Sequence, residues 1–318
     1  MADIVVLDGW TGNPGDLSWK PLEALGRCKV YDRTSPDELL ARAADADIIL
    51  TNKVAFSREV IERLPRLRYI GVIATGYNII DVEAAHERGI TVTNVPAYST
   101  ASVSQLVFAH LLNITNHVDH YSRDTRAGKW SACRDFSYCD RPIVELDGKR
   151  MGIVGLGSIG QAVARIALAL GMTVTAFTSK APESLPAGVT KAESLDALFA
   201  ESDVVTLHCP LNADTAGMVD ARRLALMKRS AILINTGRGP LVVENDLATA
   251  LRNGVIAAAA LDVLCDEPPH PDNPLLHAPH CYFTPHIGWA SNEARQRLMD
   301  NVVDNVRQYL AGNPVNTV

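Results

Sequence analysis

Short apolar runs alternate with segments of helical periodicity along nearly the whole chain. In the first hundred residues, the runs at 4–7, 28–31, 48–50, 69–74 and 90–95 predict strands. Helices are expected between them, most clearly where Ser35-Pro-Asp-Glu38 forms a capping box with proline at the first helical position, opening a helix to about residue 46. Repeated strand–helix units predict a parallel sheet with helices on both faces.

The same pattern starts again at residue 151. Strands are predicted at 151–154, 173–177, 204–208, 231–235, 255–262 and 282–284, with helices between them. Residues 99–127 form a long, largely helical stretch, residues 128–141 are irregular, and residues 291–310 predict a final amphipathic helix. We expect an α/β protein with two doubly wound parallel-sheet domains: residues 1–98 with 289–318, and an inserted domain at 99–288. A ligand should lie in the cleft between them, at the carboxyl ends of the strands.

Composition narrows the class of protein. The formal net charge of −6 over 318 residues argues against a nucleic-acid partner held by bulk charge. The N-terminus lacks a basic segment followed by an apolar run, and no apolar stretch is long enough to span a bilayer, so neither a signal peptide nor a membrane partner is expected. The six cysteines are scattered without a C-x-x-C pair, which favours free thiols in a reducing cytoplasm and no metal site.

A glycine pattern of the form G-x-G-x-x-G follows the strand predicted at 151–154, with its glycines at Gly155, Gly157 and Gly160. In such a turn the first glycine permits the tight bend, the second lets a pyrophosphate approach the backbone, and the third lets helix and strand pack closely. The helix N-terminus that follows offers N–H groups and a positive dipole end to phosphates. A glycine-rich turn alone is weak evidence, but between a strand and a helix it predicts a dinucleotide site.

Three charged side chains follow three successive predicted strands of the second series: Arg238, Glu267 and His286. Histidine suits a proton donor and acceptor near neutral pH. A glutamate beside it would favour the imidazolium and fix the tautomer, and the planar fork of arginine matches a carboxylate. Each residue alone could be a surface charge or a structural histidine. Together with the glycine turn they predict a nicotinamide enzyme that acts on a small carboxylate.

With these pieces the sequence resembles the D-isomer-specific 2-hydroxyacid dehydrogenase family over nearly its whole length. The resemblance is carried by residues 155–160, by Asn-Thr-Gly-Arg-Gly at 235–239, by Asp-Val-Leu-x-x-Glu-Pro at 262–268 and by Thr-Pro-His-Ile-Gly at 284–288. Within the family, residues 72–81 and 94–100, with Thr51-Asn-Lys53 and Trp289, look most like the glycerate dehydrogenase (hydroxypyruvate reductase) branch. The resemblance implies a Rossmann cofactor domain inserted in a flavodoxin-like substrate domain.

The resemblance also implies a reaction and a role for each residue. Hydroxypyruvate, ahead of glyoxylate, would be reduced by hydride transfer, with His286 giving a proton to the keto oxygen and Glu267 orienting His286. Arg238 would hold the substrate carboxylate and polarise the carbonyl, and backbone N–H groups around Thr75 and Gly76 would also bind the carboxylate. The remaining implied contacts are with the cofactor: Ser158 and Ile159 at the pyrophosphate, His208, Cys209 and Pro210 along the adenosine, and Thr236, Arg238, Asp262 and His286 near the nicotinamide.

Family members are commonly dimers, which implies a homodimer paired through about residues 101–142. The aromatic residues Trp130, Phe136 and Tyr138 fit such an interface, and core packing would explain them equally well.

The end of the strand at 173–177 departs from the pattern of NAD enzymes. Such an enzyme should carry an acidic residue there to accept from the ribose 2′-OH. Here Phe177 is followed by Thr178, Ser179 and Lys180, whose hydroxyl and cationic groups suit a 2′-phosphate. We therefore lean to acceptance of NADP(H), with an NAD(H) enzyme that tolerates this loop as the alternative. Gln105 also departs from the glutamate of many relatives, and carries no functional prediction.

One residue and two rival functions stay open. Lys53, on a predicted strand-end loop, either meets the substrate or is a solvated lysine. A phosphoglycerate dehydrogenase should add basic residues for the substrate phosphate and often a regulatory domain, which we do not expect because the chain stops at Val318, soon after the last helix. A nicotinamide-sensing corepressor should bring long disordered tails, which the composition does not indicate.

Overall fold

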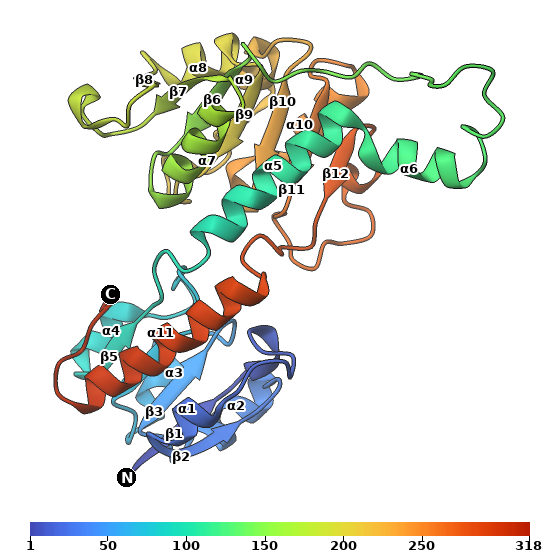
Figure 1. Cartoon of the computed structure of the whole chain (residues 1–318). Coiled ribbons are helices and arrows are strands. Elements are labelled where there is room, and N and C mark those ends of the chain that lie inside the picture. Colours follow the sequence, from blue (N-terminus) through green and yellow to red (C-terminus); the bar gives the residue numbers. More distant parts are fainter. The chain divides into compact units, whose positions relative to one another are not determined.

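The computed structural model describes all residues from 1 to 318 and divides the chain into two compact units, each built on one parallel sheet (Figure 1). Unit 1 consists of Met1–Ser99 and Trp289–Val318, and unit 2 consists of Thr100–Gly288. The expected α/β class with two parallel-sheet domains is therefore confirmed. No helix combines the length and the apolar character needed to cross a membrane.

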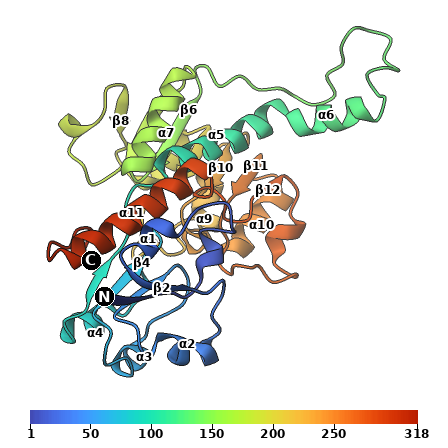
Figure 2. The same ribbon diagram turned by 60° about the horizontal axis from the view of Figure 1, so that its bottom comes forward.

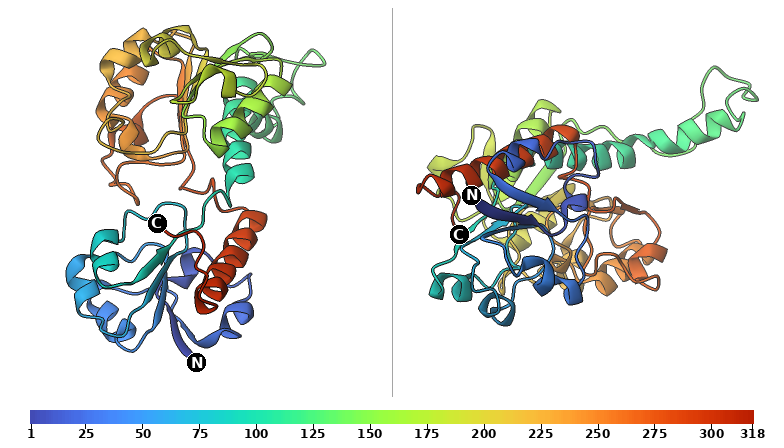
Figure 3. Two further views of the ribbon diagram at one scale, coloured as in Figure 1. Left: turned by 90° about the vertical axis from the view of Figure 1, so that its left-hand side faces the viewer. Right: turned by 90° about the horizontal axis from the view of Figure 1, so that it is seen from below.

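Unit 1 contains a five-stranded sheet in the order β2-β1-β3-β4-β5, which is the flavodoxin-like order. Helices α2, α3 and α4 bury apolar side chains on one face, whereas α1 and α11 cover the other, as the left view of Figure 3 shows for α4 and α11. The strands are β1 (Ala2–Val6), β2 (Gly26–Val30), β3 (Ile48–Thr51), β4 (Tyr69–Val72) and β5 (Thr91–Thr93). The helices are α1 (Lys20–Glu23), α2 (Pro36–Ala43), α3 (Arg58–Glu62), α4 (Val82–Glu87) and α11 (Asn292–Leu310).

Unit 2 contains a seven-stranded sheet in the order β12-β11-β10-β9-β6-β7-β8, the Rossmann order with one added strand. Helices α5 and α7 pack on one face and α8, α9 and α10 on the other. The strands are β6 (Arg150–Val154), β7 (Thr173–Phe177), β8 (Val189–Lys191), β9 (Val204–Leu207), β10 (Ile232–Asn235), β11 (Ala258–Leu261) and β12 (Cys281–Phe283). The helices are α5 (Thr100–Asn116), α6 (Val118–Arg126), α7 (Ser158–Ala169), α8 (Leu195–Glu201), α9 (Ala221–Leu226) and α10 (Glu244–Arg252).

The long helical stretch expected at 99–127 is broken into two helices. It stops at His117, whose φ of +51° is left-handed, and restarts as α6. The apolar stripe of α5 packs on α7 and the sheet, but α6 buries none of its residues. Figure 2 shows α6 and the loop that follows it extending away from the sheet of unit 2. The helix breaks at the point beyond which its residues no longer pack on the core of unit 2. The helical periodicity of the sequence does not reveal this point.

Two short elements were not expected from the sequence, α1 and β8. The edge strand β8 has only three residues, Val-Thr-Lys, of which Thr190 and Lys191 are exposed. Such a strand offers no apolar run, so pairing with β7 defines it. The strand predicted at 255–262 is also shorter, because β11 keeps only its buried centre, Ala258–Leu261.

Candidate functional site

The glycine turn between β6 and α7 has a different constraint at each glycine. Gly155 has a φ of +91°, and a Cβ there would lie 2.6 Å from the backbone nitrogen of Cys209. A Cβ on Gly160 would lie 2.2 Å from the carbonyl oxygen of Gly155. At Gly157, by contrast, an added Cβ meets nothing within 4 Å, and no side chain caps the N-terminus of α7. The turn therefore leaves open space beside the first N–H groups of the helix, which begins at Ser158 and Ile159.

Two further side chains, at the carboxyl ends of β9 and β10, are candidates for contact with a bound dinucleotide. The hydroxyl of Thr236, just after β10, is buried and has no hydrogen-bond partner, which is uncommon for a buried polar atom. His208, just after β9, lies with Nε2 2.9 Å from Thr206 Oγ1, and burial lowers its pKa to about 3, so its imidazole is neutral. The open glycine turn, the uncapped helix and the unpartnered hydroxyl fit a nicotinamide dinucleotide.

We expect Gly157→Ala to weaken cofactor binding without unfolding the protein. Alanine at this cap should cost at most about 1 kcal/mol of stability, whereas its methyl group would occupy the space that a pyrophosphate needs, so the Kd should rise about tenfold or more. Gly160→Ala is the contrasting variant, because its Cβ would collide with Gly155 and lower the melting temperature. Titration with cofactor and thermal unfolding separate the two effects. An unchanged Kd in Gly157→Ala would remove the glycine turn from the cofactor site.

Glu267 and His286 are in direct contact. His286 Nδ1 lies 2.5 Å from Glu267 Oε2, and both side chains are about one-third exposed, at 30% and 34%. The other carboxylate oxygen, Oε1, accepts from the backbone N–H of Leu264 at 3.2 Å. Because a carboxylate only accepts, Nδ1 carries the proton, and Nε2 is left to exchange a proton with a ligand.

Asp262 holds the loop that carries His286. Its carboxylate accepts from Thr284 Oγ1 at 2.5 Å, Ile287 N at 2.9 Å and Gly288 N at 2.8 Å, and its carbonyl accepts from His286 N at 2.8 Å. These bonds hold His286 at a φ of +54°, a conformation that costs a non-glycine residue about 1 kcal/mol or more. Asp262 is 3% exposed, and its expected place near the nicotinamide stays a prediction.

Asn235 does the same for the loop that carries Arg238. Its Nδ2 donates to the carbonyl of Arg238 at 2.8 Å, and its Oδ1 accepts from Gly237 N at 3.0 Å. The carbonyl of Asn235 in turn accepts from Asp262 N, which links the two loops across neighbouring strands. Neither supporting role was expected from the sequence, although Asn235 ends the buried strand β10 and Asp262 directly follows β11.

The guanidinium of Arg238 is exposed and donates to the carbonyl of Gly237 at 2.8 Å. Its loop lies against the loop of Glu267, because a Cβ on Gly239 would lie 2.0 Å from the carbonyl oxygen of Leu264. The structure thus pairs two of the three charged residues and brings the loop of the third beside them.

Glu244, which sequence analysis did not single out, braces the loop of Glu267. Its carboxylate accepts from Cys265 N and from Asn273 Nδ2, each at 2.8 Å. An acidic residue in the first turn of a helix is common, so only the three-dimensional contacts reveal this role.

The loop after β7 carries Thr178, Ser179 and Lys180. Thr178 Oγ1 accepts from Lys180 N at 3.2 Å. The ammonium group of Lys191, in β8, is a second cation next to this loop. Its Nζ donates to the carbonyl of Lys180 at 2.7 Å. Lys191 was not expected near this loop, because the strand β8 that carries it has no apolar run in the sequence.

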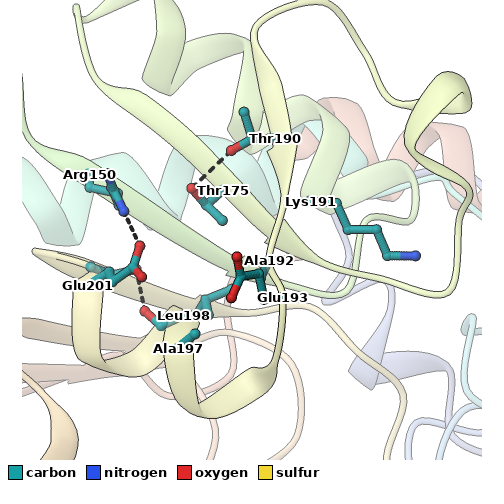
Figure 4. Close-up of a pocket in the computed structure, with 10 residues that line it drawn as sticks. Arg150, Thr175, Thr190, Lys191, Ala192, Glu193, Ala197, Leu198 and Glu201 are labelled. Carbon is teal, nitrogen blue, oxygen red and sulfur yellow. Dashed lines mark hydrogen bonds and ion pairs between the residues drawn. The ribbon is translucent and has the colours of Figure 1, made fainter.

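Lys191 also lines a polar pocket of about 180 Å³ over β7, β8 and α8 (Figure 4). Within it Arg150 pairs with Glu201, and the hydroxyls of Thr175 and Thr190 lie 3.1 Å apart. The Lys191 side chain extends away from the ion pair in Figure 4. None of the expected site residues lines this pocket, so it is not the dinucleotide site.

The expected substrate residues of unit 1 lie on two loops at strand ends. Lys53 is exposed, and its backbone N–H donates to the buried carboxylate of Asp8 at 2.6 Å. Thr75 Oγ1 donates to the carbonyl of Val95 at 2.8 Å. The backbone N–H groups of Thr75 and Gly76 have no protein acceptor, so both are available to an anion. Joint action of these groups with the charged residues of unit 2 stays a prediction.

The chain is similar to known proteins over most of its length. The family model described as "D-isomer specific 2-hydroxyacid dehydrogenase, NAD binding domain" matches residues 108–288, a range that contains the glycine turn and all three charged residues. A hydroxypyruvate reductase of Blautia hydrogenotrophica is 51% identical over 318 residues, covering 99% of both chains. A glycerate dehydrogenase of Methylorubrum extorquens is 41% identical over 293 residues, covering 91% of both. A solved structure of an acyclic imino acid reductase in complex with NADPH and D-Arg has a TM-score of 0.88 at 32% identity, covering 99% of both chains.

Proposed function

Because the chain belongs to the D-isomer-specific 2-hydroxyacid dehydrogenase family, we propose that it reduces hydroxypyruvate, ahead of glyoxylate, to the corresponding D-2-hydroxy acid. The observation that carries the proposal is the contact between His286 Nδ1 and Glu267 Oε2, which leaves one imidazole nitrogen free to deliver a proton. Relatives named hydroxypyruvate reductase and glycerate dehydrogenase support the choice of substrate.

Each residue then has a defined task. A bound nicotinamide supplies the hydride for C2 of the keto acid. His286 donates a proton from Nε2 to the keto oxygen, and Glu267 holds the imidazole and balances its positive charge. Arg238 binds the carboxylate through its planar fork and polarises the carbonyl. The free N–H groups of Thr75 and Gly76 are suited to the same carboxylate.

Lys53 is proposed to contact the carboxylate or the hydroxymethyl group of the substrate. Its backbone is fixed by the three-donor contact of residues 52–54 with Asp8, and its ammonium group is exposed. The side chain is therefore free to reach a ligand from a rigid loop.

The loop after β7 supports acceptance of NADP(H). It presents the hydroxyls of Thr178 and Ser179 and the cation of Lys180, with Lys191 beside it and no acid to accept from a ribose 2′-OH. A 2′-phosphate would gain these partners. NAD(H) as the preferred cofactor is the alternative.

A panel of 2-keto acids assayed with NADH and with NADPH tests both choices. We expect the highest kcat/KM for hydroxypyruvate, lower values for glyoxylate and for 3-phosphohydroxypyruvate, and activity with NADPH.

Ser179→Asp should shift the cofactor preference towards NADH by about tenfold or more, equivalent to about 1.4 kcal/mol, because a carboxylate there would accept from a ribose 2′-OH. Preference of the wild type for NADH by that factor would end the NADP(H) proposal, and preference for the phosphorylated acid would favour the phosphoglycerate dehydrogenase alternative.

A homodimer that pairs through about residues 101–142 is also proposed; within this range, α6 and residues 127–142 form an arm. Trp130 and Phe136 are 51% and 91% exposed there, so core packing within this chain does not explain them. A second copy of the chain would cover these two side chains.

A cytoplasmic location is proposed as well. All six cysteines are free thiols, which supports a reducing compartment.

A further inference from the structure

His110 is a buried histidine of α5 that lies outside the three charged residues. In the sequence it occupies one position of the otherwise apolar stripe of this helix, and in the structure it is 7% exposed. Its Nε2 lies 3.0 Å from Thr284 Oγ1. Burial lowers the pKa of His110, and the charge of Asp262 acts in the opposite direction.

The hydrogen-bond partners determine where the protons lie. The carboxylate of Asp262 receives two backbone N–H groups, from Ile287 and Gly288, and therefore acts as an acceptor towards Thr284 as well. A hydroxyl has one proton, which Thr284 gives to Asp262, so its lone pair must accept from His110. His110 is thus protonated at Nε2, and the chain of donors runs from His110 through Thr284 to Asp262.

This chain of hydrogen bonds ends on the loop of the proposed proton donor. Thr284 precedes His286 by two residues, and Asp262 binds the backbone of residues 286–288. The same loop also rests on α5 through apolar contacts, since a Cβ on Gly288 would lie 3.4 Å from Leu106 Cδ2 and 3.5 Å from Val103 Cγ2. His110 provides the polar part of this support.

We propose that His110 is a positioning residue for His286, acting through Thr284 and Asp262. The inference rests on the proposed function, because it assigns His110 a part in the reaction that His286 performs. His110 itself has no contact with the substrate in this scheme. Its Nε2–H orients the hydroxyl of Thr284, which in turn orients the carboxylate that holds the left-handed backbone of His286.

Two substitutions remove the donor chain with little change of volume: His110→Leu and Thr284→Val. Each should lower kcat about tenfold or more, the effect expected of a misplaced reacting group, while the KM for hydroxypyruvate and the Kd of the cofactor stay within about twofold. His110→Gln keeps an N–H donor at the distance of Nε2 and should recover most of kcat. The double variant should be no slower than the single ones, because both break the same chain.

Thr115→Val is the matched control. Thr115 is a buried residue of the same helix, and its hydroxyl donates to the carbonyl of Leu111 at 3.0 Å, away from Thr284. This variant should keep wild-type kcat. Melting temperatures of all variants show whether any loss comes from unfolding.

A second readout does not need turnover. The imidazole ¹⁵N spectrum of the full-length protein should show His110 protonated at Nε2, and His110→Leu should shift the signals of His286 whereas Thr115→Val should not. Unchanged kcat and unchanged His286 signals in His110→Leu would overturn the inference. So would equal losses in His110→Gln and His110→Leu, which would indicate a packing role. If the wild type reduces none of the keto acids, the proposed function fails, and the spectrum still decides whether His110 positions His286.

Discussion

Replacing His286 with alanine should lower kcat for hydroxypyruvate reduction about a hundredfold or more, the usual contribution of a positioned general acid. The imidazole is the proton donor in the proposed reaction, and Glu267 is its hydrogen-bond partner at 2.5 Å. Steady-state kinetics with saturating cofactor measure the loss. We expect the Kd of the cofactor to change little, because the predicted pyrophosphate site at the glycine turn does not include His286.

His280→Ala is the control for backbone strain. His280 is exposed, lies in the same unit and has a φ of +56°, so alanine meets the same left-handed conformation there as at His286, with its φ of +54°. His286→Asn complements it, since asparagine tolerates this conformation better than alanine. Turnover near the wild-type value in both His286 variants would reject the assignment of the acid.

Replacing Arg238 with glutamine should lower kcat/KM for the keto acid about a hundredfold or more, the usual effect of removing one donor to a developing negative charge. The guanidinium is exposed and donates to the carbonyl of the adjacent Gly237, so its loss should leave the melting temperature nearly unchanged. Arg238→Lys should recover only part of the activity, because an ammonium group cannot bind a carboxylate as a planar fork. Initial rates over a range of keto acid concentrations give the comparison.

Arg222→Gln serves as the surface control for this series. Arg222 pairs with Asp196 on the exposed side of α9, and its side chain is 55% exposed. Activity should not depend on it. Wild-type kinetics in Arg238→Lys would show that a simple positive charge suffices and would contradict the bidentate role.

Much of the fold followed from periodicity, because short buried strands and amphipathic helices leave different spacings of apolar residues. The predictions of secondary structure were wrong where tertiary contacts, rather than the local spacing of apolar residues, determine the element. The edge strand β8 exists because it pairs with β7. The helical stretch at 99–127 breaks at His117 because the body of unit 2 ends there, and a run of polar residues without core contacts carries no signal for where one helix stops.

The sequence by itself determined the two series of strand–helix units, the glycine turn and the three charged residues at strand ends. These features depend on neighbours within a few residues, so spacing along the chain is enough to recognise them. Only the tertiary structure decided which ordinary polar residues support the site. Asn235, Glu244 and His110 look unremarkable in sequence, and His110 meets Thr284 across 174 positions of the chain. A hydrogen bond of that kind is set by the packing of α5 on the sheet, which no local pattern encodes.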